Sequence, residues 1–304
     1  MRGESCYDEM RFQYYPMVGF AEWAAVAGAR GTVSWCRGLG LVGLLALVLW
    51  APSSPALELV ETPQVIGVSM RSLAARGDEA FARQWQAARL RGETGCRRHC
   101  AMIGRAVAAV LAAARGQSDF ARGVDWRVAV SASGSAEAYA YPGGQIVVSE
   151  GLIDSLSLSE AQLAFVLAHE VAHVLLQHER QTLALADAMI LPRGVSRSID
   201  DLYFQMGFDF GILLKLEPLL KRTELEADAA ALVLGALAGY RPNDMAGFVR
   251  KLAASEGATQ ALVATHPAGP ERLRALEQAL PLARGVWRRY GMPQLRAGRA
   301  HQHD

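Results

Sequence analysis

The chain has 304 residues, of which 51% are hydrophobic, and its 31 basic and 30 acidic side chains give a net charge of +1. This length suits one large domain or two small ones, and the apolar content excludes an intrinsically disordered chain. So small a net charge makes a nucleic-acid partner unexpected, and four cysteines are too few for a disulfide scaffold.

The N-terminal residues resemble a targeting segment. An uncharged apolar run, Leu39–Trp50, follows Arg30 and Arg37 and precedes small residues, which is the layout of a secretory signal. The run is shorter than the ~20 residues that a spanning helix needs. We therefore predict a signal over residues 1–56 and a periplasmic or otherwise exported protein. The alternative is an uncleaved anchor that keeps the chain at the membrane.

The next segments alternate between helical and extended patterns. Apolar residues at helical spacing predict helices within 77–116, and alternation predicts a strand over Trp126–Ser131. Small polar residues over 132–138 indicate a loop. Pro and Gly residues followed by β-branched residues over Tyr139–Ser149 predict a turn that leads into a second strand.

The C-terminal half is predicted to be helical. The clearest helix is Ser157–Arg180, with Ser157 and Glu160 as a capping box. Residues 181–217 are mixed and rich in aromatics, and their position suggests a lid over a cleft. Pro218 is expected to open a helix that runs to about Ala238. Further helices are expected at 243–256 and 268–284, and the tail is expected to fray from Arg288.

The predicted helix 157–180 contains the sequence His169-Glu170-Val171-Ala172-His173. Histidines at positions i and i+4 share a helix face, so both imidazoles can reach one zinc ion. Glu170 is offset beside the metal, where it can take a proton from water and pass it to a leaving amine. The alternative is a helix whose histidines make ordinary hydrogen bonds.

A third ligand is expected on the helix after Pro218. Glu224 and Asp228 lie on one face, so Glu224 can complete a His, His, Glu set, and Asp228 can accept the far N–H of a liganded imidazole. Glu226 points elsewhere and is interpreted as a solvated charge. The alternative for all three acids is an exposed helix face.

Four stretches together resemble the gluzincin metallopeptidase family, which includes the membrane protease HtpX, the CAAX-prenyl proteases and soluble periplasmic proteases of the BepA type. They are His169–His173, Glu224–Asp228, Tyr141–Leu152, and Thr265–Pro267 with Arg272 after it. The resemblance runs from about residue 125 to 280. It departs at Lys221, where relatives often have Arg.

The resemblance implies a role for each matching residue. His169, His173 and Glu224 would bind one zinc ion, Glu170 would be the general base, and Asp228 would support a ligand. His266 would either approach the metal and block its open position or help to stabilise the oxyanion. Gly144, Gln145, Ile146 and Val147 would lie on an edge strand that pairs with extended substrate, although a plain structural strand is the alternative.

The implied fold is α+β, a mainly helical zincin-like domain with a small β-sheet whose edge strand lines the cleft. We expect residues 57–124 to form an N-terminal helical part, 125–285 the peptidase core and 286–304 a flexible tail.

The implied function is an exported zinc endopeptidase in cell-envelope protein quality control. Unfolded or misfolded envelope proteins would be its substrates, with contact to the outer-membrane assembly machinery or to a membrane surface as further possibilities. The rival from another class is an exported, zinc-stabilised chaperone or binding module with little hydrolysis. A CAAX-type prenyl protease is disfavoured because no later apolar segment is long enough to span a bilayer.

The remaining candidates are weaker. Cys96 and Cys100 can pair or remain free thiols, and we expect no metal there. His178 is expected to be exposed, and His301 and His303 to be solvated in the tail.

Overall fold

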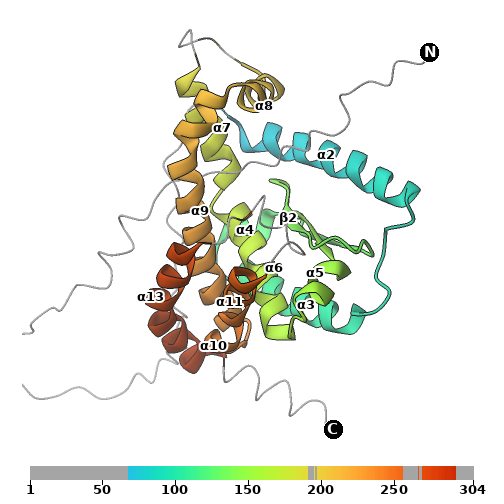
Figure 1. Cartoon of the computed structure of the whole chain (residues 1–304), viewed down its shortest axis with the longest axis vertical. Helices are drawn as coiled ribbons and strands as arrows, with labels where there is room; N and C mark the ends of the chain where they lie inside the picture. The colour runs from blue at the N-terminus through green and yellow to red at the C-terminus, as the bar shows by residue number, and fades with distance from the viewer. Residues whose placement is uncertain (1–67, 191–194, 196, 256–265, 267–268, 292–304) are drawn as a thin grey trace, which may run out of the picture.

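The computed structural model describes residues 68–190, 195, 197–255, 266 and 269–291. Helices predominate in these ranges and surround one small sheet (Figure 1), which confirms the predicted α+β class. The predicted signal and the last residues of the tail lie outside the described ranges. Among the helices that are described, none has the length and apolar character required to cross a membrane.

The helices follow one another with short connections. In chain order they are α2 (Met70–Leu90), α3 (Cys100–Arg115), α4 (Asp119–Gly123), α5 (Glu150–Ser155), α6 (Glu160–Leu175), α7 (His178–Met189), α8 (Ile199–Phe208), α9 (Phe210–Leu237), α10 (Pro242–Met245), α11 (Gly247–Ala254), α13 (Pro270–Val286) and the π-helix η1 (Trp287–Gly291). The strands are β1 (Arg127–Ser131), β2 (Ala138–Ala140) and β3 (Gln145–Ser149).

The sheet has the order β1-β3-β2, with β1 parallel and β2 antiparallel to β3. The predicted edge strand is therefore wrong. Gly144, Gln145, Ile146 and Val147 belong to the central strand or to the turn that enters it, and their backbone is paired on both sides. The outer strands of the described sheet are β1 and β2, and β2 is the one that packs against α6.

The two faces of the sheet pack against different helices. Ile146 and Val148 face the main core, which α3, α6, α9 and α13 complete. Tyr139 and Val147 face the other way and pack beside Phe81 of α2. Because β-strand side chains alternate between faces, a short strand such as β3 can hold both layers together while all five of its residues are buried.

Helix α6 differs from its predicted bounds at both ends. The capping box is formed by Ser159 and Gln162, two residues later than the predicted Ser157–Glu160 pair, because Ser157 lies in the left-handed region with φ 46°. The helix ends at Leu175 rather than Arg180. Gln177 then adopts φ 52°, also left-handed, and the chain turns before α7 begins at His178.

Helix α9 begins two turns earlier than predicted. Asp209 caps it by accepting from the backbone N–H groups of Gly211 and Ile212, and Pro218 lies inside the helix rather than at its start. Proline removes one backbone hydrogen bond there. Burial of Ile212 and Leu216 against α7 and α8 keeps this first part helical.

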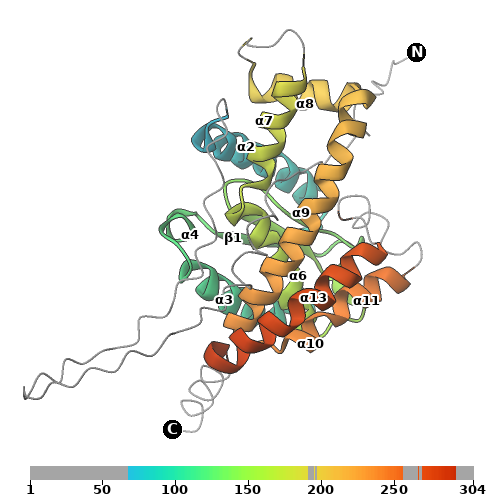
Figure 2. The same ribbon diagram turned by 90° about the vertical axis from the view of Figure 1, so that its left-hand side faces the viewer.

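The segment 181–217, predicted as a lid, is largely the rest of α7, all of α8 and the first turns of α9. These helices pack on one another and form an extension at one end of the molecule (Figure 2). At the other end, Pro270 opens α13, and residues 287–291 continue as η1. The Trp287 indole N–H donates to the Gly239 carbonyl at 2.9 Å, so the tail is not frayed at Arg288 as predicted.

Candidate metal centre

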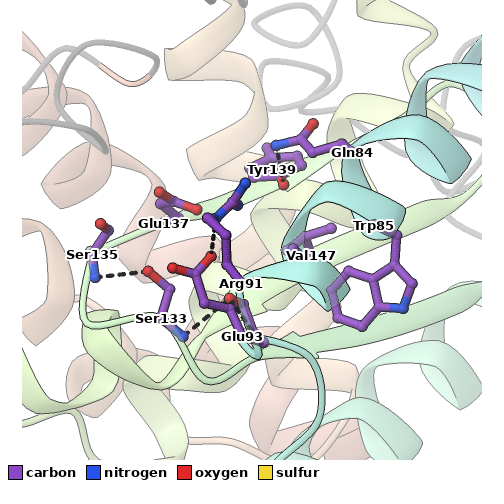
Figure 3. Close-up of a pocket in the computed structure, with 11 residues that line it drawn as sticks. Gln84, Trp85, Arg91, Glu93, Ser133, Ser135, Glu137, Tyr139 and Val147 are labelled. Atoms are coloured by element: carbon purple, nitrogen blue, oxygen red, sulfur yellow. Dashed lines mark hydrogen bonds and ion pairs between the residues drawn. The ribbon is translucent and has the colours of Figure 1, made fainter.

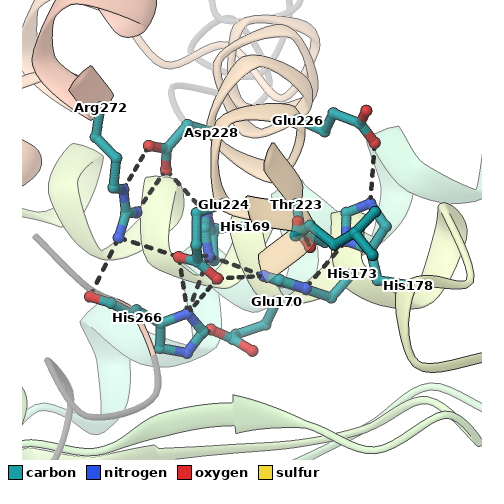
Figure 4. Close-up of polar contacts among 11 residues, drawn as sticks. His169, Glu170, His173, His178, Thr223, Glu224, Glu226, Asp228, His266 and Arg272 are labelled. Atoms are coloured by element: carbon teal, nitrogen blue, oxygen red, sulfur yellow. Dashed lines mark hydrogen bonds and ion pairs between the residues drawn. The ribbon is translucent and has the colours of Figure 1, made fainter. Parts of the chain in front are cut away.

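Packing of α6 against α9 brings the predicted ligands together. Donor atoms of His169, His173, Glu224 and His266 all lie within 4.8 Å of one another, and all four side chains are buried (Figure 4). Two imidazoles come from adjacent turns of α6, and the carboxylate comes from α9. This group of side chains, here called the four-donor cluster, can hold a metal ion.

The orientation of the two α6 histidines fits a bound cation. Their Nε2 atoms lie 3.0 Å apart, while Nδ1 of His169 lies 3.0 Å from Asp228 Oδ1 and Nδ1 of His173 lies 3.1 Å from Nδ1 of His178. If each ring carries its proton on Nδ1, two Nε2 lone pairs face each other. A shared proton or a metal ion relieves that repulsion, and imidazole nitrogen with carboxylate oxygen is a donor set that zinc binds.

Asp228 and Arg272 support this cluster from behind. The guanidinium of Arg272 donates to both carboxylate oxygens of Asp228 at 2.8 Å and lies 3.0 Å from Glu224 Oε2. It also donates to the main-chain oxygen of His266 at 3.3 Å. Arg272 therefore forms an internal ion pair and connects the acids of α9 to His266, which approaches from the C-terminal side.

The pKa shifts of the buried side chains indicate that their surroundings favour positive charge at the cluster. Burial disfavours a charged His169, but the carboxylates of Asp228 and Glu224 outweigh it and raise its pKa to about 10. Burial and the charge on His169 hold the pKa of His173 well below its ordinary value. The Glu224 carboxyl is buried too, yet His266 and Arg272 hold its pKa well below the usual range.

Glu170 lies beside the four-donor cluster, as predicted. It is 2% exposed, and its Oε1 lies 3.5 Å from His266 Nε2. Burial raises the pKa of Glu170, while the neighbouring histidines oppose that rise. A buried carboxyl at this position can both accept and release a proton, which is the requirement for a general base that later acts as an acid.

His266 enters the cluster as a fourth donor. Its Nδ1 lies 3.2 Å from each carboxylate oxygen of Glu224 and 3.3 Å from Nε2 of His169. The sequence singled out this residue by family resemblance alone, since no periodic pattern links it to α6. The geometry places it at the metal site, but it does not by itself assign a catalytic step.

Two predictions about neighbouring residues are wrong. His178 has no exposed surface and Glu226 is 8% exposed, although both were expected in solvent. His178 contacts His173, and its Nε2 lies 3.5 Å from Glu226 Oε2. Burial lowers the pKa of His178, which favours its neutral ring. The prediction for His178 assumed that α6 continues past it, but α6 ends at Leu175. The turn that follows contains no Gly or Pro from which it could be predicted.

Cys96 and Cys100 form a disulfide, one of the two states left open by the sequence. The buried carboxylate of Glu150 lies beside them and accepts backbone N–H groups of Arg97 and His99 at 3.0 and 3.1 Å. These bonds lower the pKa of Glu150 against the effect of its burial. The same three side chains, Cys96, Cys100 and Glu150, are close enough for a metal if the disulfide is reduced.

A cavity of about 170 Å³ lies between α2 and the sheet (Figure 3). Its lining includes Trp85, Arg91, Glu93 and Tyr139, and none of the lining residues belongs to the four-donor cluster. Tyr139 and Val147 line it, whereas Ile146 and Val148 face the core that contains α6. The cavity and the candidate metal centre are therefore separate features.

Comparison with known proteins gives one family and several relatives. Residues 103–280 match the model of peptidase family M48, more than half of the chain. The chain is similar to the mitochondrial metalloendopeptidase OMA1 of Schizosaccharomyces pombe, with 31% identity over 57% of this chain and 51% of that protein. The OMA1 proteins of Arabidopsis thaliana and Saccharomyces cerevisiae are 34% and 24% identical over 52% and 54% of this chain.

The aligned region covers 32% of the Arabidopsis protein and about half of the two yeast proteins. These relatives are named as mitochondrial, which contradicts the predicted periplasmic or exported location. The prediction rested on the sequence pattern of residues 1–56 alone, and these residues lie outside the described ranges. The relatives also give no support to the BepA-like, periplasmic subtype.

The match covers α3, the sheet, α6 and α9, and ends within α13, so it includes both helices that carry the four-donor cluster. The chain belongs to peptidase family M48.

Proposed function

We propose that this chain is a zinc-dependent endopeptidase. The observation that carries the proposal is the convergence of His169, His173 and Glu224 beside the buried carboxyl of Glu170. A metal site that only stabilises a fold does not need an adjacent general base, and Glu170 supplies one here. Family membership and the names of the relatives support the same activity.

The chemistry requires few residues. A zinc ion held by the cluster would lower the pKa of a coordinated water and polarise the scissile carbonyl. Glu170 takes the proton from the attacking water and delivers it to the leaving amine. Asp228 and Arg272 keep His169 and Glu224 in place, so these two ligands hold their orientation during the reaction.

His266 has a different task in this proposal. A catalytic zinc site leaves one position open, but His266 lies within hydrogen-bonding distance of both Glu224 and His169. It therefore occupies the space that water and substrate need, and it has to move away before hydrolysis. We expect His266→Ala to cleave a flexible substrate faster than the parent. Slower cleavage would instead support oxyanion stabilisation by His266.

The substrate class follows only in outline. Because the site is buried, a substrate has to reach it as an extended chain. This favours unfolded or misfolded proteins over compact ones as substrates, in keeping with a role in protein quality control. Docking to the outer-membrane assembly machinery and contact with a membrane surface remain predictions, as do the boundaries of the predicted parts of the chain.

The decisive test compares Glu170→Gln with Glu160→Gln. Both residues lie on α6, but Glu160 is in its first turn and pairs with Arg105. We expect Glu170→Gln to bind zinc and to lose about 100- to 10,000-fold in the rate of casein cleavage. Glu160→Gln should cleave casein at nearly the parent rate, and chelation should stop both. If Glu170→Gln degrades casein as fast as the parent, Glu170 is not the general base and the proposed mechanism is wrong. If the zinc-loaded parent does not cleave casein at all, the binding-module alternative is favoured.

A further inference from the structure

A second chain of polar contacts runs from the metal centre to α9, on the side away from Asp228. Nδ1 of His173 lies 3.1 Å from Nδ1 of His178, and Nε2 of His178 lies 3.5 Å from Glu226 Oε2 (Figure 4). Arg222, one turn earlier on α9, lies 4.0 Å from Glu226. All three members nearest the metal centre are buried.

We propose that His178 and Glu226 are positioning residues that fix the orientation and tautomer of His173 for zinc binding. The inference rests on the proposed zinc site but adds two residues to it. Neither residue touches substrate or the reacting atoms, so their effect is exerted through His173.

The proton positions follow from the contacts. For His173 to offer its Nε2 lone pair to a metal, its proton must lie on Nδ1, and there it can donate to Nδ1 of His178. His178 must then carry its own proton on Nε2, which points towards the carboxylate of Glu226. One consistent assignment of tautomers thus connects the ligand to an acid.

The same arrangement occurs at the other ligand. Nδ1 of His169 contacts Asp228, and Asp228 is paired with Arg272. At His173, the contact with His178 leads on to the carboxylate of Glu226. Ligand histidines generally hand their second N–H to such a partner, and loss of the partner typically weakens metal affinity about 10- to 100-fold.

The burial of His178 and Glu226 argues that the two residues have a specific role in the structure. An imidazole without exposed surface and a carboxyl that is 8% exposed are costly to hold in an apolar core unless they satisfy each other. The chain reaches this arrangement only because Gln177 adopts a left-handed conformation and redirects α7, so that its first residue returns to the ligand.

The test measures zinc affinity of the full chain by competition with a chromogenic chelator. His178→Phe removes the hydrogen bond to His173 and the polar contact with Glu226 at similar size, whereas His178→Gln keeps an acceptor for His173 and a donor for Glu226. We expect about a 10- to 100-fold loss of affinity in His178→Phe and substantial recovery in His178→Gln. The matched control is Gln181→Leu, a buried polar residue on the same helix that donates to the Leu176 carbonyl at 2.7 Å.

Three results would overturn the proposal. The first is parent-like zinc affinity in a folded His178→Phe chain, and the second is an equal loss of affinity in Gln181→Leu. The third needs no variant: nitrogen-15 NMR of the zinc-loaded parent should show a neutral His178 with its proton on Nε2, and any other form contradicts the assignment. If the unaltered chain binds no zinc, the proposed function itself fails, which distinguishes that failure from a failure of the positioning pair.

Discussion

At the scale of single residues, Arg272 organises the charges of the metal centre. It pairs with both oxygens of Asp228 and with Glu224, and all three groups are buried. Removing one partner of a buried ion pair typically costs about 3 to 5 kcal/mol, because a buried charge is left uncompensated. We expect Arg272→Met to lower the free energy of unfolding of the metal-free chain by about that amount in urea. Adding Asp228→Asn should recover part of the loss, and a single variant as stable as the parent would contradict this account.

Glu179 makes folding depend on pH. Burial raises its pKa to about 8 from an ordinary value of 4.5, and only the distant charge of Arg76 opposes the shift. An acid whose pKa is higher in the folded chain stabilises the fold fully below pH 4.5, and this contribution is lost as the pH rises through 8. Glu179→Gln should therefore gain stability relative to the parent as pH rises, on the order of 3 kcal/mol at pH 8.

The comparison that checks this is urea denaturation of metal-free protein at pH 5 and pH 8. Glu217→Gln, on the exposed surface of α9, serves as the control and should shift both values equally. A difference between parent and Glu179→Gln that is the same at both pH values would show that the carboxyl does not titrate in this range.

The sequence predicted some of these residues well and others poorly, for a physical reason. Histidines at i and i+4 share a face in any helix, so His169 and His173 needed no tertiary information. The same holds for Glu224 and Asp228 on α9. His178 and Glu226 depend on where α6 stops and how α7 returns, and a non-glycine residue at Gln177 gives no sign of that turn.

At the scale of elements, alanine substitutions at two helical glycines are expected to change stability in opposite directions. A Cβ at Gly104 on α3 would meet nothing within 4 Å, whereas a Cβ at Gly151 on α5 would lie 2.3 Å from backbone atoms of Gly134. Alanine is the better helix former, so Gly104→Ala should stabilise the chain by about 0.5 to 1 kcal/mol. Gly151→Ala should destabilise it by about 2 kcal/mol or more, because backbone must move. Thermal unfolding of the two variants checks the pair, and equal shifts would show that the contact at Gly151 is not tight.

Strand order was the part of the fold that the sequence could not supply. Alternation identified the strand that ends at Ser131, the β-branched run after Gly144 identified a second one, and both exist. It does not say which strand lies in the middle. The parallel pairing of β1 with β3 places the later strand between the earlier two, which is a tertiary choice made by the packing of both sheet faces.

At the scale of the whole molecule, two separate apolar clusters support the helices around the metal centre. The main core packs α6 against the C-terminal part of α9, and a second apolar cluster holds the extension of α7, α8 and the start of α9. The described residues of the predicted lid form a packed helical extension that contacts α9. Its exposed side chains include Phe204, Phe208 and Phe210, which are 61%, 66% and 70% exposed.

The central claim is that zinc binds where α6 and α9 meet, and zinc X-ray absorption of the loaded full chain tests it most directly. The account predicts one zinc per chain with only nitrogen and oxygen neighbours, at about 2.0 to 2.2 Å, and clear scattering from imidazole rings. Sulfur neighbours at about 2.3 Å would place the metal at Cys96 and Cys100 instead and would contradict the account.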